Sequence, residues 1–148
     1  MTLIEVIISV TILVIVSATT FGYLGGYRRG VDVNTETEKI SSYLKQAQSR
    51  ARNGESGVAW GVHFVNQSGQ SYYQLFQGAS YNANSIVETI YLTNNVTFTN
   101  PANSSTKDII FQRISGWPVA TSSIAIVSKT NGNITKTISI NSLGVINY

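Results

Sequence analysis

Apolar residues occupy the start of the chain almost without interruption. No charged residue lies between Val6 and Tyr27, and the few residues before Val6 include one acid, Glu5. A helix rises about 1.5 Å per residue, so roughly 20 such residues cross a hydrocarbon core about 30 Å thick. Thirteen of the first twenty residues are Val, Ile or Thr, which favour strands in water. Lipid cannot satisfy the backbone of an open strand. We therefore expect residues 1–27 to form a helix that anchors the chain in a membrane or packs in a bundle of identical segments.

The pattern changes to that of an amphipathic helix from Val31 to about Asn53. Apolar positions recur there at spacings of four, three and four residues, and charged residues mostly fall off this stripe. The spacing places the apolar residues on one helix face. Asn53-Gly54 is a typical helix stop. We expect residues 28–53 to continue the first helix and to pack on a globular domain through Ile40, Leu44, Ala47 and Ala51.

After Gly54 the apolar residues alternate with polar ones, which is the pattern of half-buried strands. Asn66–Gly69 predicts a turn, and Asn131-Gly132 is the strongest hairpin signal in the chain. The polar stretch from Thr99 to Lys107 predicts a loop. A long helix followed by strands predicts an α+β fold, with an antiparallel sheet over residues 54–148 laid on the helix. The expected strands are 58–64, 72–76, 86–92, 96–98, 108–114, 123–129, 134–140 and 145–146.

Glu5 is the exception within the apolar segment. An acidic residue at the centre of a membrane-spanning helix costs roughly 2.5–3.5 kcal/mol, and less near an end. Three arrangements would lower this cost. The carboxylate can interact with the helix N-terminus, it can reach the membrane interface, or it can pair with the α-amino group of Met1 in the same chain or in a neighbouring chain.

Glycines follow the apolar segment at four positions within nine residues. Each lowers helix stability by about 1 kcal/mol relative to Ala. The sequence is compatible with a flexible segment or with a simple kink where the chain leaves the membrane. The positions concerned are Gly22, Gly25, Gly26 and Gly30.

Composition narrows the chemistry that the chain can perform. Charged residues make up 11%, the formal net charge is +3, and there is no cysteine. His63 is the single histidine and lies in a predicted strand, where a structural or surface role is expected. One histidine without cysteine excludes the usual zinc sites, and the few acids after Glu55 are scattered. We expect no catalytic residue, no metal and no cofactor.

The segment Thr2-Leu3-Ile4-Glu5, followed by an apolar helix, resembles the mature N-terminus of type IV pilins and type II secretion pseudopilins. In that family a leader is cut just before residue one, and the new terminus is N-methylated. The resemblance implies that Met1 is the processed, methylated end, although Met1 could be an ordinary initiator. No basic leader precedes the apolar segment, which favours its removal. Glu5 would register incoming subunits by pairing with the terminal amine of another subunit. Gly22, Gly25 and Gly26 would loosen the helix.

A second resemblance concerns the end of the chain. The residues from Phe111 to Gly116, a hairpin and the final run Ser139–Ile146 are similar to the C-terminal half of GspH/FimT-type pseudopilins and minor pilins. The resemblance implies that the chain is held in the cytoplasmic membrane before assembly and then forms a surface filament whose core consists of residues 1–27. Its partners would be copies of the chain, the prepilin peptidase and the pilus assembly machinery, with roles in adhesion, twitching motility or DNA uptake. Two alternatives stay open. The chain can be a minor subunit or pseudopilin that primes or caps a filament, or it can bind nucleic acid through its positive net charge.

Overall fold

The computed structural model of the chain describes residues 2–148, with the side chains of residues 19–29 left out of the description. One helix, α1, spans Leu3–Arg52, and the remaining elements are short. Two 3-10 turns occur, η1 (Glu55–Gly57) and η2 (Ala83–Ser85). The strands are β1 (Trp60–Asn66), β2 (Tyr72–Gln77), β3 (Ile86–Tyr91), β4 (Val96–Asn100), β5 (Ser105–Phe111), β6 (Ser122–Ser128), β7 (Thr135–Ile140) and β8 (Ile146–Asn147).

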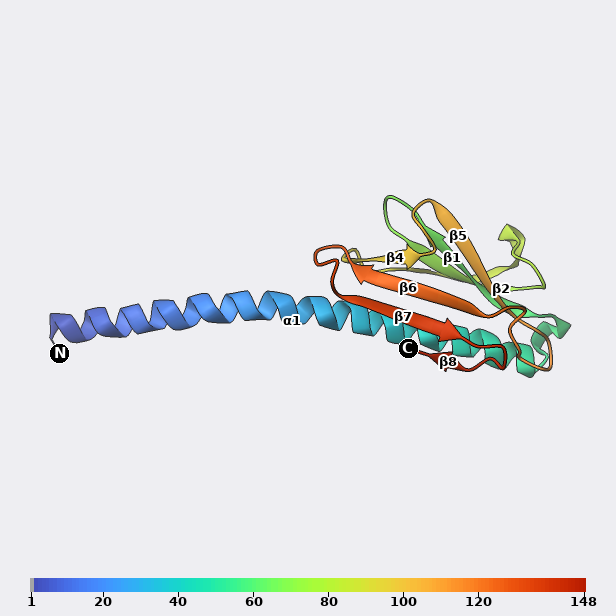
Figure 1. Cartoon of the computed structure of the whole chain (residues 1–148), viewed down its shortest axis with the longest axis horizontal. Helices are drawn as coiled ribbons and strands as arrows, with labels where there is room; N and C mark the ends of the chain where they lie inside the picture. Colours follow the sequence, from blue (N-terminus) through green and yellow to red (C-terminus); the bar gives the residue numbers. More distant parts are fainter. Residues whose placement is uncertain (1) are drawn as a thin grey trace.

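The strands form two antiparallel sheets rather than the one sheet that the sequence predicts. The first has the order β3-β2-β1-β5, and the second has the order β4-β6-β7-β8. The strand β5 does not pair with its predecessor β4 but returns to lie beside β1, with Trp60 opposite Phe111. This long-range pairing divides the strands between two sheets, and local alternation carries no information about it. Figure 1 shows the C-terminal half of α1 lying along the strands while its N-terminal half extends away from them.

The core lies between the C-terminal half of α1 and both sheets. The four stripe residues of the helix, from Ile40 to Ala51, are all fully buried, as the spacing predicts. They meet alternate residues of the first sheet, among them Trp60, Val62 and Phe64, and residues of the second sheet such as Ile126. A single apolar cluster therefore joins helix and sheets, and the α+β architecture predicted from the sequence is confirmed.

The helix also carries a buried charge, although the sequence predicts that charged residues mostly lie away from the apolar stripe. Glu36 is 1% exposed, and its Oε1 accepts hydrogen bonds from Thr93 Oγ1 at 2.6 Å and Lys39 Nζ at 3.0 Å. Asn95 donates to Asp32 at 3.2 Å. The hydrogen bonds from Thr93 and Asn95 join α1 to the connection between β3 and β4. They fix the point at which the helix enters the domain.

The helix ends where the sequence predicts. Asn53 is its C-cap, and Gly54 adopts a left-handed conformation with φ +64°. The amide of Gly54 donates to the carbonyl of Ala51, which satisfies one of the free carbonyls of the last turn. A glycine adopts this φ without the strain that a side chain would add.

Several strand boundaries differ from the prediction. The polar stretch 99–107 is not a loop throughout, because β4 continues to Asn100 and β5 begins at Ser105. Hydrogen bonding to β6 and β1 extends these strands through polar residues. The strand predicted at 108–114 ends at Phe111, since Gln112 turns back and donates to the carbonyl of Trp117.

Among the described residues, no helix combines the length and the apolar character that crossing a bilayer requires. The membrane anchor over residues 1–27 stays a prediction.

Candidate assembly surface

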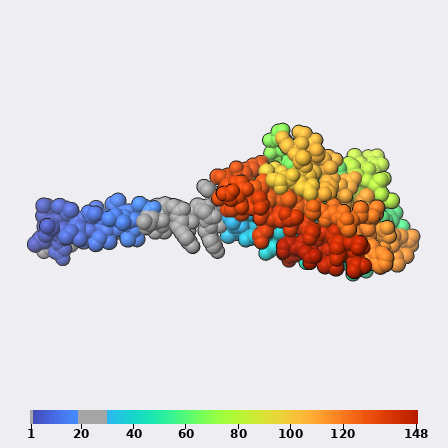
Figure 2. Space-filling view, in the orientation of Figure 1, coloured from blue at the N-terminus to red at the C-terminus, as the bar shows by residue number. Residues whose placement is uncertain are grey.

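The N-terminal half of α1 exposes apolar side chains on every side. Large aliphatic residues from Leu3 to Val16 are 44–82% exposed. Successive residues point about 100° apart around a helix, so the exposed residues cover its whole circumference. Figure 2 shows residues 2–18 as a rod that stands free of the domain. A helix that is apolar on all sides is normally buried on all sides. We call this part of α1, residues 3–16, the apolar rod.

Polar residues within the rod do not interrupt its apolar character. The hydroxyls of Ser9 and Thr11 donate to the carbonyls of Glu5 and Ile7 at 2.8 and 2.7 Å, and Ser17 donates to Leu13 at 2.7 Å. Each bond satisfies the hydroxyl within the helix itself, four residues back. The hydroxyls therefore need no water, which lowers the cost of burying the rod against another apolar surface.

Glu5 is the one charged side chain of the rod. It lies in the first turn of α1 and is exposed. Thr2 is the N-cap residue but forms no side-chain cap, and its carbonyl accepts from the amides of Glu5 and Val6 at 3.1 and 3.4 Å. An acid in the first turn interacts favourably with the helix dipole. Within residues 2–18 no basic side chain lies near it, so a full counter-charge has to come from the chain terminus or from another molecule.

The remaining predicted site residues lie outside the described part of the chain. This applies to Met1, for which methylation and pairing with Glu5 are predicted, and to the glycines of the predicted flexible segment, Gly22, Gly25 and Gly26. The roles assigned to these residues stay predictions.

Sequence reasoning missed a polar row on the outer face of the first sheet. Thr89, Gln74, His63 and Asp108 are direct neighbours in register across β3, β2, β1 and β5. Gln74 donates to Thr89 at 3.0 Å. The Nδ1 of His63 donates to the carboxylate of Asp108, because a carboxylate can only accept. From the sequence, a histidine and a glutamine could be placed at outward positions of their strands. Only the pairing of the strands shows that the two side chains are neighbours.

Tyr81 covers this row. Its ring stacks on His63 with centroids 3.7 Å apart, and its hydroxyl donates to Gln74 at 2.8 Å. Burial raises the pKa of Tyr81, with smaller contributions from Tyr72 and from the negative charge of Asp108. His63 is 7% exposed under the ring. The row therefore holds the β2–β3 connection on the sheet.

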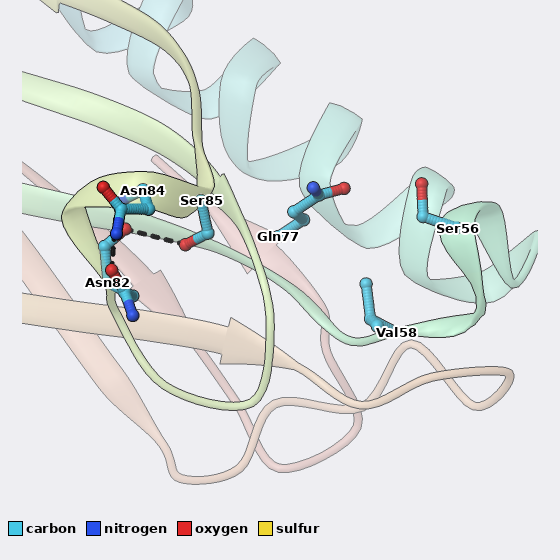
Figure 3. Close-up of a pocket in the computed structure, with 6 residues that line it drawn as sticks. All are labelled: Ser56, Val58, Gln77, Asn82, Asn84 and Ser85. Atoms are coloured by element: carbon cyan, nitrogen blue, oxygen red, sulfur yellow. Dashed lines mark hydrogen bonds between the residues drawn. The ribbon is translucent and has the colours of Figure 1, made fainter.

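The same connection lines a shallow cavity of about 280 Å³. Figure 3 shows that Asn82, Asn84 and Ser85 lie on one side of it, with Ser56 and Val58 from the segment after α1 on the other. Asn82 organises the turn, since its side chain accepts from the amide of Asn84 at 2.9 Å and its carbonyl accepts from Ser85 at 2.8 Å. The lining offers amides and hydroxyls but no acid or base. Among the residues that the structure describes, no three His, Asp or Glu side chains are placed to hold a metal ion.

Comparison with known proteins identifies a fold but no sequence relative. No protein-family profile matches the chain, and no curated protein matches it in sequence. Two crystal forms of the type IV minor pilin FimU from Pseudomonas aeruginosa strain PAO1 are similar in structure. One has a TM-score of 0.58 at 15% identity, covering 77% of this chain and 90% of the FimU chain. The other has a TM-score of 0.59 at 15% identity, with coverages of 78% and 86%. The chain therefore has a type IV pilin-like fold.

Proposed function

We propose that the chain is a structural subunit of a type IV pilus-like filament and polymerises by bundling the apolar rods of many copies. One observation carries the proposal: a domain with a pilin-like fold extends a helix that is apolar around its whole circumference and bears a single carboxylate. Fully burying an exposed Val, Leu or Ile contributes roughly 1.5–3 kcal/mol. Eleven large aliphatic side chains are exposed between Leu3 and Val16, so packing of rod against rod provides a large driving force for assembly.

Glu5 sets the register of that bundle in our proposal. Removing one partner of a buried ion pair costs about 3–5 kcal/mol because the other charge is left uncompensated. A stagger that brings the carboxylate of one copy to the terminal amine of Met1 in the next copy avoids this cost. Other staggers leave both charges in an apolar surrounding. The role is structural rather than enzymatic, and before assembly the rod is held in the cytoplasmic membrane.

The Glu5→Gln variant tests the pairing, because it keeps the size and hydrogen-bonding capacity of the side chain and removes the charge. We expect the yield of sheared filaments to fall at least tenfold while the amount of chain in the membrane fraction is unchanged. Glu38→Gln is the matched control, since Glu38 is an exposed acid on the same helix, and it should assemble normally. Filaments at the wild-type yield from Glu5→Gln would disprove the pairing.

A second candidate is a minor subunit that primes or caps a filament built mainly from another pilin. The fold similarity favours it, because both similar structures are of a minor pilin. Quantitative mass spectrometry of sheared filaments separates the two functions: a major subunit forms the bulk of the protein, and a minor subunit a small fraction.

Nucleic-acid binding is supported by the positive net charge alone. It would be seen as a salt-dependent shift of DNA in a gel.

A further inference from the structure

A second group of exposed apolar side chains lies at the opposite end of the molecule from the N-terminus. It comes from the connection between β5 and β6 and from the connection between β7 and β8. Both connections lie at the end of the long axis where α1 ends (Figure 1). The exposed fractions range from 48% to 69%. We call this group the distal patch: Ile114, Trp117, Val119, Leu143 and Val145.

The two connections touch each other and share one helix side chain. A Cβ placed on Gly144 would lie 3.1 Å from the carbonyl oxygen of Gly116. The Nε2 of Gln48 donates to the carbonyls of both glycines, at 3.0 Å for Gly116 and 2.8 Å for Gly144. In the space-filling view the orange and red segments of these connections adjoin at this end (Figure 2). The two connections that carry the patch therefore lie side by side, and both are fixed to α1.

The backbone of the patch is strained at Ile114. Ile114 has φ +71°, which is unusual for a β-branched residue and costs of the order of 1–3 kcal/mol. Its amide donates to the carbonyl of Ala51 at the end of α1 at 2.8 Å. The side chain of Ile114 is nevertheless 69% exposed. The chain thus stabilises a strained loop that directs an apolar side chain into solvent, which indicates a partner absent from the isolated subunit.

An apolar partner fits the patch, because all five of its side chains are apolar and its tryptophan is 53% exposed. Within the described residues, the apolar rod is the larger of the exposed apolar surfaces, and it lies at the other end of the same helix. Two complementary surfaces at opposite ends of one molecule produce a head-to-tail contact, which propagates into a filament when it does not close into a ring.

We propose that the distal patch of one subunit packs against the apolar rod of a second copy of this chain. The inference rests on the proposed filament function and adds a partner for the far end of the domain. The 50 residues of α1 span about 75 Å. Two copies joined by this contact are therefore displaced along the helix by roughly 50–75 Å, estimated from the rise per residue. Copies with smaller displacements contact each other through their rods alone. In the filament, each rod is then covered by the rods of these neighbours and by the distal patch of a more distant copy.

The absence of cysteine in the chain makes disulfide trapping selective. We would pair Leu143→Cys with a cysteine at Ile4, Ile8 or Ile12, which samples successive turns of the rod, and oxidise assembled filaments. Each doubly substituted copy has one reactive group at either end, so the expected product is a ladder of dimers, trimers and larger species on a denaturing gel. The matched control replaces Leu143→Cys by Ser68→Cys, an exposed polar position in the β1–β2 turn, and should give no ladder.

The outcomes separate this inference from the proposed function. If Ile8→Cys alone gives dimers in filaments but no double variant gives a ladder, the rods bundle and the patch contact is wrong. Dimers from Leu143→Cys alone would indicate patch-to-patch pairing and would also overturn it. If the chain forms no filaments at all, the proposed function and the inference both fail. Quenching of Trp117 by brominated lipids in the unassembled Glu5→Gln chain would identify a membrane as the partner and overturn the contact between copies.

Discussion

Gly61 lies at a position in β1 where a side chain has no room. A Cβ added there would lie 2.6 Å from Cζ of Phe76 and 2.8 Å from the carbonyl oxygen of Ile109. Backbone cannot yield as a flexible side chain can, so Gly61→Ala should destabilise the chain by about 1–3 kcal/mol. Urea unfolding of the full chain in detergent would measure this. The control Gly69→Ala meets no atom within 4 Å and should change stability by less than about 0.5 kcal/mol.

Tyr73 carries a buried hydroxyl without a hydrogen-bond partner among the described residues. Burial raises the pKa of this hydroxyl above its usual value, and the negative charge of Glu36 raises it further, followed by Tyr43 and Glu88. An unpaired buried polar group costs about 1–3 kcal/mol. Tyr73→Phe should therefore be neutral or should stabilise the chain by about 1 kcal/mol at pH 7.

The same substitution predicts a change at alkaline pH. The folded pKa of Tyr73 lies above the unfolded value of about 10. The folded state therefore favours the protonated hydroxyl over the ionised one. The stability that this preference provides is fully present below pH 10 and is lost as the pH rises towards the folded pKa. Tyr73→Phe should show a smaller loss of stability above pH 10 than the wild type. The matched control is Tyr91→Phe, which removes one hydroxyl from an exposed tyrosine. A lower midpoint at pH 7 with an unchanged alkaline slope would contradict this account of Tyr73.

At the scale of elements, the two halves of α1 differ in how their apolar residues are distributed around the helix. The half in the domain has one buried stripe, and the half outside it is apolar on all sides. Between them lie Gly22, Gly25 and Gly26, whose predicted flexibility falls outside the described residues. Replacing Gly25 and Gly26 by Ala should favour the helix by about 2 kcal/mol. Filaments of this variant should therefore extend less under force in optical tweezers, and unchanged mechanics would refute the flexible segment.

The elements themselves could be predicted from the sequence to different degrees. Ile40, Leu44, Ala47 and Ala51 repeat at helical spacing, and each of them is buried. The stop at Asn53-Gly54 also follows from local chemistry. The division into two sheets could not be predicted, because it depends on β5 pairing with β1, and the paired residues lie 39–51 positions apart in the chain. The row from Thr89 to Asp108 was missed for the same reason.

Parts of the candidate surface could be predicted from local pattern and others could not. Glu5 and the apolar residues around it are consecutive, so their chemistry is visible in the sequence. The distal patch joins residues about 30 positions apart, and Gln48 connects them from a third place in the chain. Glu36 is spaced as a helix-face residue, but its charge suggested exposure. Its burial depends on Thr93 and Lys39, which supply its hydrogen bonds.

At the scale of the whole molecule, the folded domain and the assembling segment are separable. The first fully buried apolar residue of the domain in chain order is Val33, and every other core residue follows it. We expect a fragment of residues 31–148 to be a monomer in sedimentation velocity without detergent. Its unfolding midpoint should match that of the detergent-solubilised full chain. Stable oligomers of the fragment would show that the domain, rather than the rod, carries the main contact between copies.

The central claim is that the apolar rods of many copies form the interior of a filament. A helical reconstruction of isolated filaments by electron cryo-microscopy tests it most directly. The account predicts that residues 3–16 of neighbouring copies pack along the filament axis, with each Glu5 carboxylate within ion-pair distance of the terminal amine of another copy. A filament whose interior is formed by the sheet domains, with residues 3–16 facing solvent, would contradict it.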